Sequence, residues 1–351
     1  MRKNVSFLLV LGLLLSTLLS ACSPAVVEGY KVGMVTDQGG IDDASFNATS
    51  WVGVEMAEEE LGVDGSYLES TGPTDYAPNI TQYLNQDADL IVTVGWMLAD
   101  DTATFAAENP DTNFAIVDFA YDPPIPNVRN LVFNTDEAAV LAGYVAAAAS
   151  KTGKVATFGG VNIPTVSIFM VAFESGVELY NEKYGTSVEV LGWDTAANTG
   201  VFVGNFDSTD DGRRVAEEFL GEGADVIMAV AGPVGLGTAQ AILEHGDAWF
   251  IGVDTDWRLS APEYKDIILC SVLKKLENAV FDSIEKAASP DFEGYDGEVW
   301  VGTLENDGVG LTSVAEGAVP DQVLEDIEQI GKDVKAGDVN TGWTDYLSSL
   351  E

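Results

Sequence analysis

Cysteine and histidine are almost absent from this chain of 351 residues, which contains two Cys and one His. Cys22 lies in an N-terminal leader-like segment, so Cys270 has no partner and the folded part must rely on its hydrophobic core rather than on a disulfide. Cys270 ends the apolar run 267–270 and is expected to be a buried small hydrophobic residue. His245 precedes Gly246 at the end of a predicted helix, which is a common surface position.

Motifs of several enzyme and cofactor classes are also missing. The sequence contains no Ser-His-Asp set, no metal-ligand cluster and no Walker loop. The glycine-rich stretch 232–237 lacks the GxGxxG order of a dinucleotide-binding loop. We therefore expect a protein that is not an enzyme and that carries no cofactor and no metal, although a carboxylate pair could act in catalysis without histidine.

Basic residues are scarce, since 16 Lys and Arg face 57 Asp and Glu and the formal net charge is −41. Such a surface repels nucleic acids and anionic lipid headgroups, so binding to either is disfavoured. The acidic clusters 58–60, 100–101 and 210–211 are interpreted as solvated faces. A salty habitat, in which ions screen the repulsion, is one explanation for the charge.

Long hydrophobic runs are confined to the N-terminus. Arg2 and Lys3 precede the apolar run 7–19, which closes on Leu-Ser-Ala-Cys at 19–22. This order predicts a signal peptide, and the run is too short to span a membrane as a helix. The ending resembles a bacterial lipobox, in which Cys22 is lipidated and becomes the mature N-terminus; the alternative is an ordinary signal with a chance cysteine. We expect residues 1–21 to be removed, 22–29 to form a tether, and the protein to be lipid-anchored on the extracytoplasmic face of the cell membrane.

From residue 30 onward, apolar strand-like runs alternate with helical stretches in two successive sets. The first set comprises strands at 31–36, 66–69, 90–94, 114–117 and 129–133, and helices at 45–61, 76–86 and 98–108. The second set comprises strands at 154–158, 188–191, 226–230 and 249–253, and helices at 138–149, 167–184, 210–221 and 236–245. Alternation of this kind predicts mostly parallel sheets covered on both faces, hence two Rossmann-like lobes with a ligand cleft at the strand ends.

Polar residues and glycines collect where those strands should end. The segment 37–47 follows the first strand, and in it Asp43 or Ser45 could cap the next helix, with capping the favoured role for Ser45. Phe46 could pack into the core or offer its ring for stacking. Asp118 and Asp254 end two later strands, and this recurrence of carboxylates at strand ends favours a binding site.

The segments 37–47, 114–118, 232–237, 252–256 and 271–275 together look like those of the BMP (basic membrane protein) family, purine nucleoside-binding lipoproteins that serve ABC importers. The resemblance implies an α/β fold of the type I periplasmic binding protein class, with two lobes, a hinge and a nucleoside enclosed between them. It places 30–134 plus about 272–297 in one lobe and 135–271 plus about 298–351 in the other. A monomer is expected.

The resemblance also assigns roles to residues. Asp37 and Asn47 would contact the base, Asp118 would bond the purine edge, Phe46 would stack on the base, and Phe206 is the candidate second ring from the opposite lobe. Asp254 and Lys274 would hold the ribose hydroxyls, and Gly232 would offer backbone groups. The chain departs from the family at Trp257, where Gln is usual, and at 162–164, where a more Gly-rich turn is common.

These observations predict a lipoprotein that captures a purine nucleoside (adenosine, guanosine or inosine) and delivers it to an ABC importer permease. Alternatives remain open: a protein that binds a sugar or another small solute, a nucleoside-processing enzyme, or a sensory or adhesive surface protein that uses the same cleft.

Overall fold

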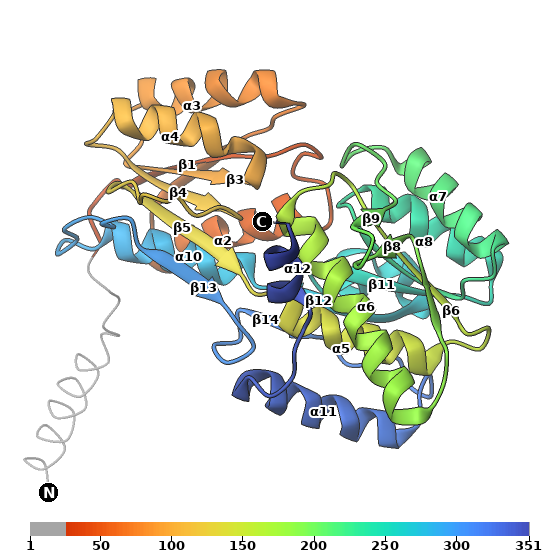
Figure 1. The fold of residues 1–351 in the computed structure, drawn as a ribbon. Helices are drawn as coiled ribbons and strands as arrows, with labels where there is room; N and C mark the ends of the chain where they lie inside the picture. Colours follow the sequence, from red (N-terminus) through yellow and green to blue (C-terminus); the bar gives the residue numbers. More distant parts are fainter. Residues whose placement is uncertain (1–25, 351) are drawn as a thin grey trace, which may run out of the picture.

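The computed structural model describes residues 26–350 and arranges them in two lobes, each built on a six-stranded sheet (Figure 1). The predicted signal peptide, Cys22 and the first part of the predicted tether lie outside the described residues. Within 26–350, no helix has the length and apolar character that crossing a membrane requires.

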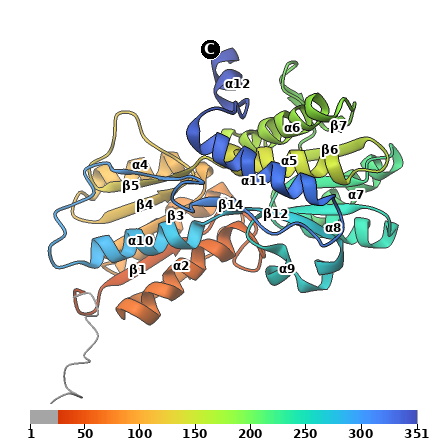
Figure 2. The same cartoon turned by 90° about the horizontal axis from the view of Figure 1, so that it is seen from below.

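Lobe 1 is built on a fully parallel sheet with the strand order β13-β5-β4-β3-β1-β2. Its strands are β1 (Lys31–Val35), β2 (Asp64–Leu68), β3 (Leu90–Val94), β4 (Asn113–Val117), β5 (Val128–Phe133) and β13 (Val299–Gly302). Helices α2 (Phe46–Leu61) and α10 (Leu276–Ala288) lie side by side on one face, while α3 (Tyr76–Asn85) and α4 (Ala99–Glu108) cover the other (Figures 1 and 2). The central strand β3 is buried along its whole length, as expected for a sheet covered on both faces.

Lobe 2 repeats this arrangement with the order β14-β12-β11-β10-β6-β7, in which β14 alone runs antiparallel to its neighbour. Its strands are β6 (Lys154–Gly159), β7 (Glu189–Leu191), β10 (Val226–Val230), β11 (Trp249–Asp254), β12 (Ile268–Lys274) and β14 (Val309–Leu311). Alternate residues of β10 pack against opposite layers: one layer is α5 (Asp136–Ala149) with α6 (Pro164–Tyr184), and the other is α7 (Thr209–Gly221) with α8 (Val234–His245).

Smaller elements complete the molecule. These are the hairpin β8 (Trp193–Asp194) and β9 (Thr199–Gly200), the helices α9 (Trp257–Ser260), α11 (Asp321–Ala336) and α12 (Trp343–Ser349), and the 3₁₀ turns η1 (Pro73–Asp75), η2 (Trp96–Leu98) and η3 (Pro262–Ile267). Helix α11 packs on α5, and α12 packs on α6 (Figures 1 and 2).

The described chain passes between the lobes three times, after Phe133, after Lys274 and after Gly302. Strand β13 pairs with β5, so residues 299–302 belong to the sheet of lobe 1. The boundary expected at about 297 placed these residues in lobe 2, and the structure corrects it. The sequence of a short edge strand does not indicate which of two similar sheets the strand joins.

The two predicted sets of elements up to residue 254 are present, each within a few residues of its expected bounds, which confirms the two Rossmann-like lobes. Cys270 is fully buried, and burial raises the pKa of its thiol to about 12, so the prediction of a buried hydrophobic residue is confirmed. His245 is exposed at the end of α8, where Gly246 adopts a left-handed conformation with φ of 88°, as predicted.

Helices α5 and α6 approach each other unusually closely because glycine stands at the crossing on both sides. A Cβ added at Gly143 would lie 1.9 Å from the carbonyl oxygen of Phe173, and one added at Gly176 would lie 2.0 Å from that of Val140. No side chain larger than hydrogen fits either position without moving a helix backbone. Gly143 and Gly176 therefore set the spacing between α5 and α6 in lobe 2. Helix α6 begins beside the cleft between the lobes.

Candidate functional site

A pocket of about 580 Å³, measured to include its opening to solvent, lies between the lobes at the carboxyl ends of the parallel strands. This is the place where open parallel sheets bind ligands. All eight residues predicted for the ligand site line it, namely Asp37, Phe46, Asn47, Asp118, Phe206, Gly232, Asp254 and Lys274. The structure thus brings together side chains that are more than two hundred residues apart in the chain.

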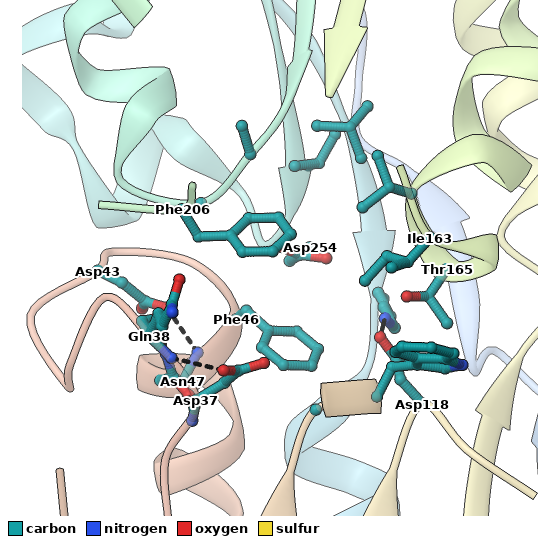
Figure 3. A pocket seen from close by; sticks show the side chains of 18 of the residues that line it. Asp37, Gln38, Asp43, Phe46, Asn47, Asp118, Ile163, Thr165, Phe206 and Asp254 are labelled. Atoms are coloured by element: carbon teal, nitrogen blue, oxygen red, sulfur yellow. Dashed lines mark hydrogen bonds and ion pairs between the residues drawn. The ribbon is translucent and has the colours of Figure 1, made fainter. Parts of the chain in front are cut away.

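Two phenylalanine rings point into the pocket from opposite lobes (Figure 3). Phe46 is the first residue of α2, in lobe 1. Phe206 belongs to the loop between β9 and α7 in lobe 2, and its ring lies against the bare backbone of Gly160, where a Cβ would be 2.3 Å from the ring. Asn205 stiffens this loop, because its Oδ1 accepts from the backbone N–H groups of Asp207 and Ser208. Two aromatic faces on the walls of one cleft can enclose a flat ring system.

Asp37 lies between β1 and the turn at 38–39 and is held in place by three neighbours. Its Oδ1 accepts from the backbone N–H of Gln38 at 2.7 Å and from the hydroxyl of Tyr76, while its own N–H donates to Asn47 Oδ1 at 3.0 Å. Asn47 also donates from Nδ2 to the carbonyl oxygen of Gln38 at 3.2 Å. Both amide atoms of Asn47 are therefore used to fix the turn, and its predicted contact with a base remains a prediction. Gly95 leaves space beside Asp37 Oδ2, because a Cβ there would come within 2.5 Å.

Asp118 and Lys274 form an ion pair across the cleft. Lys274 Nζ, at the end of β12 in lobe 2, donates to Asp118 Oδ2 of lobe 1 at 2.6 Å, with side-chain exposures of 3% and 8%. The ammonium group also lies over the rings of Phe46 and Phe133, at 4.8 and 5.1 Å from their centroids. Lys274 was predicted to approach the sugar near Asp254, and this stays a prediction; its hydrogen-bonded partner among the described residues is Asp118.

Asp254 occupies the position in lobe 2 that corresponds to Asp118 in lobe 1. Asp254 is the last residue of β11 and Asp118 directly follows β4, which is the third strand of its sheet as β11 is of its own. Both have a left-handed backbone, with φ of 69° at Asp254 and 68° at Asp118, which Asp tolerates better than most residues. The carboxylate of Asp254 accepts from the hydroxyl of Ser45 at 2.7 Å, so this contact also joins the two lobes.

The helix cap at the start of α2 differs from the favoured prediction. The Ser45 side chain makes no capping bond, whereas the Asp43 carboxylate accepts from the backbone N–H groups of Ser45, Asn47 and Ala48. Capping, the role favoured for Ser45 over ligand contact, was therefore wrong, and Asp43, the other candidate cap, does the capping. A carboxylate accepts several N–H bonds at once and matches the positive end of the helix dipole better than a hydroxyl.

Four buried carboxylates share the pocket with one basic side chain among its described lining residues, Lys274. Burial raises the pKa of Asp37 to about 6, against the hydrogen bonds from Tyr76 and Gln38, and raises that of Asp43 to about 6 as well. Burial also raises the pKa values of Asp118 and Asp254, and the charge of Lys274 opposes both shifts. The cleft is therefore rich in hydrogen-bond acceptors and suits a neutral ligand that carries N–H and O–H donors.

Several lining residues were not predicted. They include Gln38, Asp43, Trp96, Ile163, Thr165, Phe169 and Pro233. Trp96 follows β3 and Ile163 precedes α6 at the end of β6, so the strand-end rule that found Asp118 could have found both. Trp257 lies in the core instead: it is fully buried against Phe250, and its Nε1 donates to the carbonyl oxygen of Val253 at 3.0 Å. It supports the turn that carries Asp254 from behind rather than lining the pocket.

Comparison with known proteins agrees with this geometry. The family model of PnrA-like ABC transporter substrate-binding proteins matches residues 30–339. The chain belongs to this family. A Lactococcus lactis protein named an ABC transporter nucleoside-binding protein, BmpA, is 29% identical over 89% of this chain and 92% of its own length. A Pyrococcus abyssi protein named an uncharacterized lipoprotein is 28% identical over the full chain and 90% of its own length.

Among solved structures, an ABC transporter solute-binding protein from Aeropyrum pernix K1 superposes with a TM-score of 0.79 at 25% identity, covering 88% of this chain and 92% of the other. The likeness confirms the predicted fold class, a type I periplasmic binding protein with two α/β lobes. As a member of this family, the protein is an ABC transporter substrate-binding protein, and the pocket between its lobes is the candidate substrate site.

Proposed function

We propose that the protein binds a purine nucleoside in the interlobe pocket. The observation that carries this proposal is the pair of rings, Phe46 and Phe206, which face one pocket from opposite lobes beside buried carboxylates. A planar base fits between two aromatic faces, and the carboxylates accept from base N–H groups and sugar hydroxyls. A simple sugar offers hydroxyls to the carboxylates but has no flat ring for the two aromatic faces.

The predicted roles of the acidic residues divide the pocket into two ends. Asp37 follows β1 and Asp118 follows β4, the two strands that flank β3 in lobe 1, and both would accept from the base. Asp254 of lobe 2 would accept from ribose hydroxyls beside Gly232. Each carboxylate oxygen accepts more than one hydrogen bond, so the existing contacts to Tyr76, Lys274 and Ser45 leave acceptor capacity for a ligand.

We further propose that the mature protein is a monomer anchored through lipidated Cys22 on the extracytoplasmic face and that it delivers its nucleoside to an ABC importer permease. The family assignment, the lipobox-like segment 19–22 and the lipoprotein name of a full-length relative support this proposal. The pocket has no basic residue except Lys274 among its described lining, which disfavours nucleotides with charged phosphates as cargo.

Mass spectrometry of small molecules released by denaturing the purified protein tests the ligand class. We expect adenosine, guanosine or inosine in the released fraction; a monosaccharide in their place would contradict the nucleoside assignment.

Incubation with inosine, followed by separation of base from nucleoside, tests the non-enzymatic role. Intact inosine is expected, because its glycosidic bond should survive binding, and release of hypoxanthine would refute a binding-only function.

A further inference from the structure

Ser45 makes a contact that its own lobe does not require. Its hydroxyl, fully buried at the start of α2, donates to Asp254 Oδ2 at 2.7 Å and lies 3.4 Å from the carbonyl oxygen of Val253. Both acceptors belong to β11 of lobe 2. The contact joins the two lobes across the cleft, so any opening that separates these two walls breaks it.

The turn before α2 orients the Ser45 hydroxyl toward lobe 2. Asp43 accepts from the backbone N–H of Ser45 at 2.9 Å and caps the helix, so the Ser45 side chain is free of that task. Ala44 is held at φ of 53°, which is unfavourable for a residue with a Cβ and persists only where surrounding contacts over-determine the backbone. Ser50 shows the contrast: its hydroxyl bonds the carbonyl oxygen of Phe46 within the same helix.

We propose that Ser45 is the positioning residue of the ligand site: it orients the Asp254 carboxylate and couples ligand binding to lobe closure. This inference rests on the proposed function. With Oδ2 bonded to Ser45, the carboxylate is fixed in rotation, and Oδ1 is presented to a ligand hydroxyl. A hydrogen bond to a charged, buried acceptor is stronger than one between neutral groups, so one hydroxyl suffices for a measurable coupling.

A double-mutant cycle tests the coupling. Inosine affinity is measured by calorimetry for wild type, Ser45→Ala, Asp254→Asn and the double variant. Ser45→Ala should weaken binding by about ten- to a hundred-fold, and the double variant should bind as Asp254→Asn does, because Ser45 acts through that carboxylate. Ser50→Ala, the matched serine of the same helix, should bind as wild type. Wild-type affinity in Ser45→Ala, or independent losses that multiply in the double variant, would overturn the proposal.

Solution X-ray scattering of the same variants separates this inference from the proposed function. If inosine fails to bind wild type, the nucleoside assignment fails, and the ligand-free profiles then decide the role of Ser45. A ligand-free wild type more compact than Ser45→Ala supports the lobe contact. Identical ligand-free profiles in a protein that does not bind inosine would overturn it, because the contact would then not form in solution.

Discussion

At the scale of single residues, the cleft buries four carboxylates whose negative charge is opposed by one lysine among the described lining residues. Lys274 is bonded to Asp118 and lies over the rings of Phe46 and Phe133, and its positive charge favours the ionised forms of Asp118 and Asp254. Removing one partner of such a buried pair leaves the other charge uncompensated, which is far more costly than losing an exposed ion pair. A ligand that donates to Asp37 and Asp254 supplies the compensation that a single lysine cannot.

The carboxyl of Asp37 predicts a pH dependence of binding. Its pKa of about 6 lies above the ordinary value of 3.8, so acidification below 6 protonates an acceptor that the ligand requires. Nucleoside affinity should fall by up to about tenfold per pH unit below 6. Calorimetric titrations at about pH 7.5 and about pH 5 measure this change. An affinity that is equal at the two pH values would show that the ligand does not use an ionised Asp37.

The same groups predict the opposite trend for folding stability. The folded-state pKa values of Asp37 and Asp43 are raised, so the folded protein binds more protons than the unfolded chain between about pH 6 and pH 4. Their contribution to the free energy of unfolding therefore increases as the pH falls through this window. In thermal melts of the ligand-free proteins, wild type should gain stability relative to Asp43→Asn between about pH 7.5 and about pH 5, and a constant difference would contradict the shifted pKa.

The proposed stacking on the base is best tested at Phe206, because Phe46 also contacts the ammonium of Lys274. Replacing an aromatic ring that stacks on a base costs about 1–3 kcal/mol. Phe206→Ala should therefore weaken nucleoside binding by about 5- to 150-fold in calorimetry. Phe292→Ala, which removes another half-buried loop ring far from the pocket, should leave affinity unchanged. If Phe206→Ala and Phe292→Ala bound the nucleoside with equal affinity, the base would not lie between the two rings.

The residue types of the pocket could be predicted from the sequence, but their hydrogen-bonded partners could not. Asp118 and Asp254 were found because carboxylates that end parallel strands converge on one edge. The pairing of Lys274 with Asp118, and of Ser45 with Asp254, depends on how far the lobes close, for which no local pattern exists. Trp257 stands where the family usually has Gln, and its burial in the core against Phe250 could not be read from that departure.

At the scale of elements, the helix layers hold the strand ends in register across the cleft. Helix α6 is pressed onto α5 through Gly143 and Gly176, and its first turn carries Thr165 into the pocket wall. A change at this crossing therefore reaches the ligand site through the backbone rather than through a side chain.

Gly143→Ala tests this crossing. The new Cβ would meet the Phe173 carbonyl oxygen at 1.9 Å, and overpacking of this kind typically costs about 1–3 kcal/mol. The melting temperature should drop by several degrees in calorimetry. Gly331→Ala in α11 is the matched control, because its Cβ would lie 3.9 Å from the nearest atom, Leu141 Cδ1, and helix propensity alone favours Ala by up to about 1 kcal/mol. A Gly143→Ala variant as stable as this control would refute the close crossing.

The sequence predicted elements well where helix and strand periodicities alternate strictly, up to residue 254. Beyond that point, β13 and β14 are short edge strands with partly exposed residues, and nothing local distinguishes them from loops or assigns them to a sheet. Helix α12 depends on packing against α6, with Tyr346 bonded to Asn198 at 2.6 Å, which no sequence pattern reveals.

At the scale of the whole molecule, two similar lobes joined by three chain crossings enclose one pocket. The acidic charge of −41 repels anionic surfaces, so the proposed attachment to a membrane requires a covalent anchor rather than binding through the protein surface. Stable anchoring takes more than one acyl chain, as a lipidated N-terminal cysteine provides.

Cys22→Ala tests the anchor. In cell fractionation, the variant should appear in the soluble fraction, whereas the wild type should appear in the membrane fraction. Mass spectrometry of the wild type should show a mature chain that starts at a lipidated Cys22. A wild-type protein that is already soluble and begins at another residue would contradict the lipobox interpretation and favour an ordinary signal peptide.

The most direct test of the central claim is a calorimetric titration of ligand-free protein with adenosine, guanosine, inosine and free ribose. If the pocket encloses a nucleoside, each nucleoside should saturate a single site, and ribose should bind at least about tenfold more weakly because it lacks the stacked base. Saturable binding of ribose with no response to any of the three nucleosides would contradict the account.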